Sequence, residues 1–94
     1  MDPKINQIII DYLKPYDPKE IGVFGSYARG EMNPESDIDI LYTLNKKITL
    51  FDLVQIKLDL EEKLQHKIDF VSKSGLKKWI IPNIMKDLKV IYEK

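Results

Sequence analysis

GSYARGEMNPESDIDILY, residues 25–42, is the stretch that decides how this chain folds. It opens with a Gly-Ser pair directly after an apolar run, and it closes on a second apolar run that contains Asp37 and Asp39. A Gly-Ser turn between a strand and a helix can direct backbone N–H groups and one hydroxyl towards a phosphate. Two carboxylates on one strand can bind a hard divalent cation. The stretch therefore predicts two strands joined through a short helix, with a phosphate cradle and a metal site.

The Gly-Ser turn has a functional and a purely structural interpretation. In the first, Gly25 lets the backbone approach a phosphate, Ser26 supplies a hydroxyl donor, and Arg29 clamps phosphate oxygens about one helical turn further on. In the second, Gly25 only turns the chain and Ser26 caps a helix. The pair by itself favours the structural interpretation, since Gly-Ser is common after strands.

The two aspartates share a face of their predicted strand. Side chains alternate across a strand, so Asp37 and Asp39 lie about 6.6 Å apart on one side while Ile38 and Ile40 face the core. Asp69 interrupts a later β-like run. If the two strands are neighbours, the three carboxyl groups are expected to converge within a few ångströms of a common point. Three such carboxylates can hold two Mg²⁺ ions for an in-line displacement at phosphorus. The alternative is that all three are solvated positions on exposed strand faces.

Composition bounds the class of protein. The 94 residues predict a single domain, residues 1–94. Fifteen basic and fifteen acidic side chains cancel, which argues against a nucleic-acid-binding protein. The absence of cysteine excludes disulfides and thiolate chemistry. No apolar run approaches the length of a membrane span or a signal core, so we expect a cytoplasmic protein without a membrane partner.

Hydrophobic periodicity and turn residues predict the remaining elements. The order is helix, strand, helical turn, strand, helix, strand, helix, strand, which indicates an α/β (α+β) fold with a small mixed sheet of about four strands. The expected helices cover residues 2–13, 26–30, 49–64 and 82–87, and the expected strands cover residues 19–24, 37–42, 67–72 and 88–92. Asp2 is expected to cap the first helix, and Thr49 and Asp52 are expected to form a capping box before the third. Pro18 is expected to lie in the turn that follows the first helix.

The joint spacing of these features resembles the nucleotidyltransferase superfamily that includes DNA polymerase beta. Within it, residues 25–42 look closest to the minimal nucleotidyltransferases, the small antitoxin partners of HEPN proteins in toxin–antitoxin pairs. The resemblance implies the nucleotidyltransferase fold, a nucleoside triphosphate substrate and Mg²⁺, with two ions expected. It also implies roles for individual residues: Gly25, Ser26 and Arg29 at the phosphates, and Asp37, Asp39 and Asp69 as catalytic metal ligands.

By the same resemblance, the chain would transfer AMP from ATP to a hydroxyl of a partner HEPN ribonuclease toxin, with tyrosine as the expected acceptor. It would then be the antitoxin of a type VII-like pair, and a homodimer or hetero-oligomer is compatible with that role. Two alternatives stay open. One is an antitoxin that neutralises its toxin by binding alone, and the other is the catalytic subunit of a two-subunit enzyme acting on a small molecule or an RNA end.

Three further features have no assigned role. His66, the only histidine, is interpreted as an exposed polar residue rather than a general base. Tyr27 either stacks on a base or packs in the core, and the sequence does not decide. The apolar cluster Trp79–Ile81 is expected to complete the core, with a partner contact as the alternative.

Overall fold

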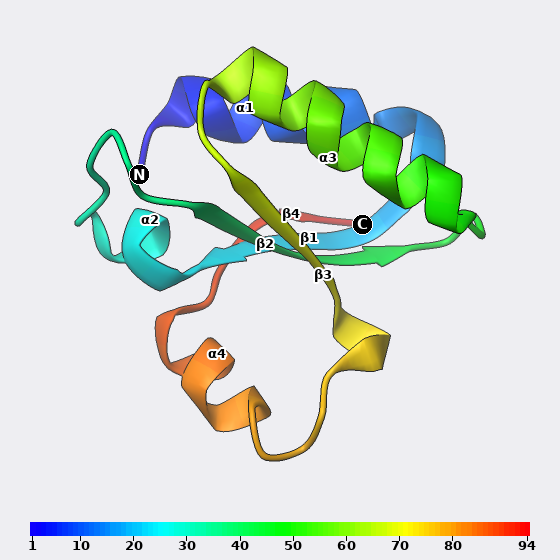
Figure 1. Cartoon of the computed structure of the whole chain (residues 1–94). Helices are drawn as coiled ribbons and strands as arrows, with labels where there is room; N and C mark the ends of the chain where they lie inside the picture. Colours follow the sequence, from blue (N-terminus) through cyan, green and yellow to red (C-terminus); the bar gives the residue numbers. More distant parts are fainter.

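A four-stranded mixed sheet forms the centre of the computed structural model, which describes all 94 residues (Figure 1). The strand order is β3-β2-β1-β4; β1 pairs antiparallel with β2 and β4, and β2 pairs parallel with β3. The parallel pair is connected through α3, as a crossover between parallel strands requires. The strands are β1 (Pro18–Phe24), β2 (Ile38–Leu44), β3 (Ile68–Ser72) and β4 (Lys89–Glu93).

Helices lie on both faces of this sheet. Figure 1 shows α1 and α3 side by side above it, and α4 below it. None of the helices is both long and apolar enough to cross a membrane. Their bounds are α1 (Pro3–Leu13), α2 (Gly25–Arg29), α3 (Leu50–Leu64) and α4 (Ile81–Asp87), with short 3₁₀ turns at Lys14–Tyr16 and Lys73–Gly75.

The predicted helix starts are confirmed in their capping chemistry. Asp2 accepts a hydrogen bond from the backbone N–H of Lys4, and proline follows it in the first helical turn. Thr49 and Asp52 form the expected capping box before α3. Local side-chain chemistry thus sets where these two helices begin.

The core lies between the upper face of the sheet and the helices α1 and α3. Alternate strand residues such as Ile38 and Ile40 are fully buried in it. Burying a side chain of this size contributes roughly 1.5–3 kcal/mol. Because residues 38 and 40 face this core, the residues between and before them face the other way. The hydrophobic pattern of β2 therefore directs Asp39 away from α1 and α3.

The sequence-based fold class is confirmed, with corrections to individual elements. β2 begins at Ile38, so Asp37 precedes the strand instead of opening it. Pro18 is the buried first residue of β1 and not a turn residue; a first strand position is one that proline occupies without breaking the ladder. Trp79 is 72% exposed, so the expectation that it completes the core is wrong. Ile80 and Ile81 are only half-buried and lie outside the main core cluster.

Candidate active site

The turn between β1 and α2 has a backbone that only glycine adopts without strain. Gly25 has φ +71°, in the left-handed region, and it opens the five-residue helix α2. No side chain caps the start of α2, so the interpretation of Ser26 as a helix cap is wrong. Gly30, with φ +75°, ends the helix in the same left-handed conformation. Two glycines therefore set the two ends of α2, and Ser26 lies in its first turn.

Gly25 packs directly against Asp39. A Cβ added at Gly25 would overlap Oδ2 of Asp39 and would lie 3.2 Å from its Cγ. The sequence analysis assigned Gly25 to a close approach between the backbone and a phosphate. In the folded chain, the group that Gly25 approaches is the carboxylate of Asp39. The glycine joins the candidate phosphate cradle to the candidate metal site, because any larger residue would displace Asp39.

Three carboxylates occupy neighbouring positions beside this turn. Asp39 on β2 lies opposite Phe24 on β1, and it lies opposite Asp69 on β3 in the parallel register. Asp37 directly precedes β2. Asp37 and Asp69 are exposed and Asp39 is half-buried. The sequence interpretation required the strands of Asp39 and Asp69 to be neighbours. The pairing of β2 with β3 meets that requirement and puts Asp69 beside Asp39.

The electrostatics of Asp39 reflect this arrangement. The pKa of its carboxyl is raised to about 6, mainly by burial and also by the negative charges of Asp69 and Asp37. Arg29 acts in the opposite sense and lowers the pKa. The ionised form of Asp39 is thus disfavoured, and a nearby positive charge would stabilise it.

The carboxylates are not gathered around one point. No group of three or more acidic, histidine or cysteine side chains is arranged to hold a metal ion. The expectation that the three carboxyl groups converge within a few ångströms is therefore not met in this structure, and like charges have a physical reason to stay apart. The donor chemistry nevertheless fits Mg²⁺, because oxygen ligands of this kind suit it and a cation would relieve the repulsion that raises the pKa of Asp39.

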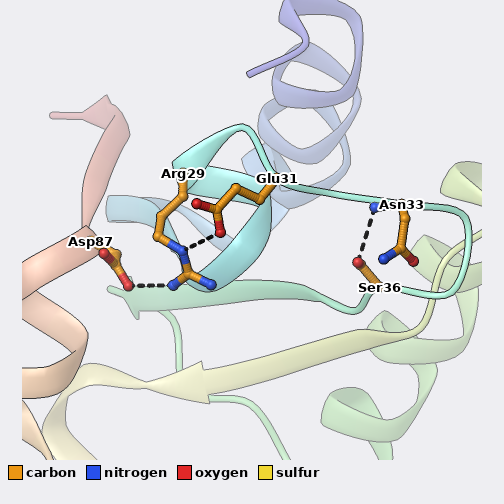
Figure 2. Close-up of polar contacts among 5 residues, drawn as sticks. All are labelled: Arg29, Glu31, Asn33, Ser36 and Asp87. Atoms are coloured by element: carbon orange, nitrogen blue, oxygen red, sulfur yellow. Dashed lines mark hydrogen bonds and ion pairs between the residues drawn. The ribbon is translucent and has the colours of Figure 1, made fainter.

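Arg29 is held by two acidic side chains. Figure 2 shows its guanidinium between Glu31, at 3.0 Å from Nε, and Asp87 of α4, at 2.7 Å from Nη1. These hydrogen bonds raise the pKa of Arg29 above its usual value. The residue therefore links α2 to α4. To clamp a phosphate it would have to exchange at least one of these carboxylates.

Two residues that the sequence left unassigned have defined positions. His66 is half-buried, and its Nδ1 lies 3.0 Å from the carbonyl oxygen of Ser36, so the interpretation of His66 as an exposed polar residue is wrong. Tyr27 is 2% exposed and packs in the core, which leaves no ring face for a base. Its hydroxyl contacts the backbone of Asp2 and the side chain of Asn6, at 2.5 Å from Oδ1. Neither contact has a local sequence signal, because each joins residues more than 20 positions apart.

Replacing Tyr27 by phenylalanine is expected to lower the free energy of unfolding by about 1–2 kcal/mol. The change keeps the ring but leaves polar groups of Asp2 and Asn6 without their shared partner. Urea denaturation followed by circular dichroism measures the loss. Tyr92→Phe, a half-buried tyrosine of β4, is the control. Equal stability of the two variants would contradict the role assigned to the Tyr27 hydroxyl.

Comparison with known proteins places this geometry in a family. The family model described as polymerase beta nucleotidyltransferase matches residues 7–94. Protein adenylyltransferase MntA of Thermococcus cleftensis is 39% identical over 70 residues, which cover 74% of this chain and 71% of that protein.

Two solved structures have the same fold. One, a toxin–antitoxin structure with AMP-PNP, superposes with a TM-score of 0.83 at 21% identity and covers 95% of this chain and 73% of that one. The other is a complex of a tri-AMPylated HEPN toxin of Shewanella oneidensis with its MNT antitoxin. It superposes with a TM-score of 0.79 at 19% identity, over 100% of this chain and 74% of that one. At these identities the superpositions establish the fold only.

The extent of the family match, together with the identity to a named adenylyltransferase, confirms the resemblance seen in residues 25–42. This chain belongs to the polymerase beta family of nucleotidyltransferases.

Proposed function

We propose that this protein is a Mg²⁺-dependent protein adenylyltransferase that transfers AMP from ATP to a hydroxyl, with tyrosine as the expected acceptor, on a partner HEPN toxin. The observation that carries the proposal is the placement of Asp39 between the Gly25 turn and Asp69. It brings a candidate triphosphate cradle against a set of carboxylates, which is the combination that phosphoryl transfer needs.

The relatives support the choice of acceptor. The Thermococcus relative is named a protein adenylyltransferase, and the Shewanella antitoxin with the same fold was solved with an AMPylated HEPN toxin. The structure with AMP-PNP pairs this fold with an ATP analogue. These properties belong to those proteins, and their transfer to this chain is the proposal.

The reaction forms one bond and breaks one. The acceptor oxygen attacks the α-phosphorus of ATP, the bond from that phosphorus to the bridging oxygen breaks, and pyrophosphate leaves with the electron pair. The acceptor proton passes to a carboxylate, for which we propose Asp69. The protein contributes mainly by holding both reactants in line, as is usual for phosphoryl transfer.

Each site residue has a proposed task. Ser26 donates its hydroxyl to a triphosphate oxygen, and Gly25 keeps the turn close to Asp39. Arg29 approaches the phosphates after it gives up a carboxylate partner. Asp37, Asp39 and Asp69 would hold Mg²⁺, two ions being expected. When bound, Mg²⁺ supplies positive charge that neutralises the leaving pyrophosphate and lowers the pKa of the attacking hydroxyl.

Labelling of the partner tests the proposal. The protein is incubated with ATP labelled at the α-phosphate, Mg²⁺ and the product of the adjacent gene. We expect label on a tyrosine of that partner, identified by peptide mass spectrometry, and no label in EDTA.

Matched controls separate the alternatives. The double variant Asp37→Asn, Asp39→Asn keeps the shape of both side chains and removes their charge, so label that persists undiminished in it refutes the assigned chemistry. A tight complex that suppresses toxicity without any label indicates an antitoxin that acts by binding. Label on a small molecule or an RNA end, with none on the partner, indicates a two-subunit enzyme.

A further inference from the structure

We propose that His66 is a positioning residue for Asp37: its ring fixes the peptide group that precedes this carboxylate. The inference rests on the proposed function, because it assigns Asp37 to the metal site. It concerns a residue whose ring has its hydrogen bond to Ser36 and to none of the three aspartates.

The hydrogen bond between His66 and Ser36 has a defined direction. His66 Nδ1 lies 3.0 Å from the carbonyl oxygen of Ser36, across 30 residues of sequence. A carbonyl oxygen can only accept, so Nδ1 carries the hydrogen and donates. The Ser36 carbonyl belongs to the peptide bond that leads into Asp37. The ring therefore restrains the rotation that would swing Asp37 out of place.

The other polar groups of Ser36 are bound in a turn on its N-terminal side. The Ser36 N–H donates to the Asn33 carbonyl at 3.0 Å. In return, the Asn33 N–H donates to the Ser36 hydroxyl at 3.0 Å, the bond drawn in Figure 2. The side chain of Asn33 also accepts from the N–H of Glu35. The turn thus fixes the N–H and hydroxyl of Ser36, and His66 fixes its carbonyl, so Asp37 follows a residue that is held at both ends.

The same end of α3 also holds the starts of both parallel strands. The carboxylate of Glu61 accepts from the N–H of Ile68 at 2.9 Å, and the carbonyl of Lys67 accepts from the N–H of Ile38 at 2.8 Å. Gln65, with φ +57°, ends the helix and turns the chain so that residues 66 and 67 reach β2. The Lys67 carbonyl thus holds the peptide that follows Asp37, and the His66 ring holds the peptide that precedes it.

Asp37 and His66 also border one hollow. An open hollow of about 570 Å³ is lined by Ser36, Asp37 and His66 among other, mostly polar or charged, residues. Asp37 is exposed at this edge, so side-chain packing contributes little to holding it. Hydrogen bonds to its backbone are therefore the main restraint on where its oxygens lie.

Three substitutions at His66 separate its two ring nitrogens. Asparagine places its amide nitrogen where Nδ1 lies, glutamine places its amide where Nε2 lies, and alanine removes both. We expect His66→Ala and His66→Gln to weaken Mn²⁺ binding by about 10- to 100-fold, the range seen when the partner of a metal-ligating group is removed. We expect His66→Asn to retain affinity within a few-fold. In the labelling assay kcat should fall in the first two variants while KM for ATP stays near the wild-type value.

Two readouts do not depend on turnover. Mn²⁺ binding is measured by electron paramagnetic resonance on the folded variants, with circular dichroism to confirm folding. Because the chain has a single histidine, its ¹⁵N–¹H NMR spectrum reports the tautomer of His66 without assignment work, and we expect hydrogen on Nδ1.

Asp37→Asn separates failure of this inference from failure of the proposed function. If Asp37→Asn binds Mn²⁺ as tightly as the wild type, the metal site and the inference built on it both fall. If Asp37→Asn loses affinity and His66→Ala does not, only the His66 inference is overturned. Rescue by glutamine and not by asparagine, or a neutral ring with hydrogen on Nε2, would also overturn it, since each assigns the effect to the other nitrogen.

Discussion

Replacing Gly25 by alanine is expected to cost about 2 kcal/mol of unfolding free energy and to lower the rate of AMP transfer by about 100-fold. Two physical effects add. A non-glycine residue at φ +71° carries a strain of roughly 1–3 kcal/mol. The new Cβ also overlaps Asp39 Oδ2, so the carboxylate must move, and a misplacement of about 1 Å at a reacting centre can cost 100-fold.

Gly30→Ala is the matched control for this prediction. Gly30 has nearly the same dihedral angle, φ +75°, but a Cβ there would meet no atom within 4 Å. The Gly30 variant should therefore lose stability through strain alone and keep most of its activity. Urea denaturation gives the stability of both variants, and initial labelling rates give their activity. An equal loss of activity in the two variants would show that the Gly25–Asp39 contact has no catalytic consequence.

Asp39→Asn is expected to stabilise the protein while it abolishes most of the activity. The folded state raises the pKa of Asp39 to about 6 from an ordinary 3.8, so the folded chain binds this proton more tightly than the unfolded chain does. Ionised Asp39 therefore disfavours folding: the penalty is absent below pH 3.8, grows between pH 3.8 and 6, and is complete above pH 6. The full shift corresponds to roughly 3 kcal/mol. Because Asp39 is only half-buried, solvent screening reduces the expected gain to about 1 kcal/mol.

Thermal unfolding in EDTA at pH 4 and pH 8 measures this effect. The asparagine variant should melt higher than the wild type at pH 8, and the two should approach each other at pH 4. The labelling rate should fall by about 100- to 1,000-fold, the usual cost of removing one transition-state charge stabiliser. Glu62→Gln, at an exposed carboxylate of α3, controls for general charge effects. A variant less stable than the wild type at pH 8 would contradict the assigned electrostatics.

The carboxylate site was predictable from local sequence patterns only in part. The alternation of Asp37, Ile38, Asp39 and Ile40 predicts that the two aspartates face away from the core, because burial of the isoleucines decides the face. The place of Asp69 depends on which strand pairs with β2 and in which register. Residues 39 and 69 are opposite each other because α3 returns the chain parallel to β2, and that pairing is a property of the whole sheet.

By itself, the sequence determined the order of the elements, the helix caps, the need for glycine at the β1–α2 turn and the family. These depend on residues close together in the chain, through hydrogen bonds and periodicities of a few positions. Only the tertiary structure decided that Gly25 packs on Asp39, that Arg29 pairs with Asp87 across 58 residues, and that His66 holds the peptide before Asp37. Such contacts form between segments that meet only when the sheet is assembled. No spacing in the sequence encodes them, because the energies that select them belong to the packed fold.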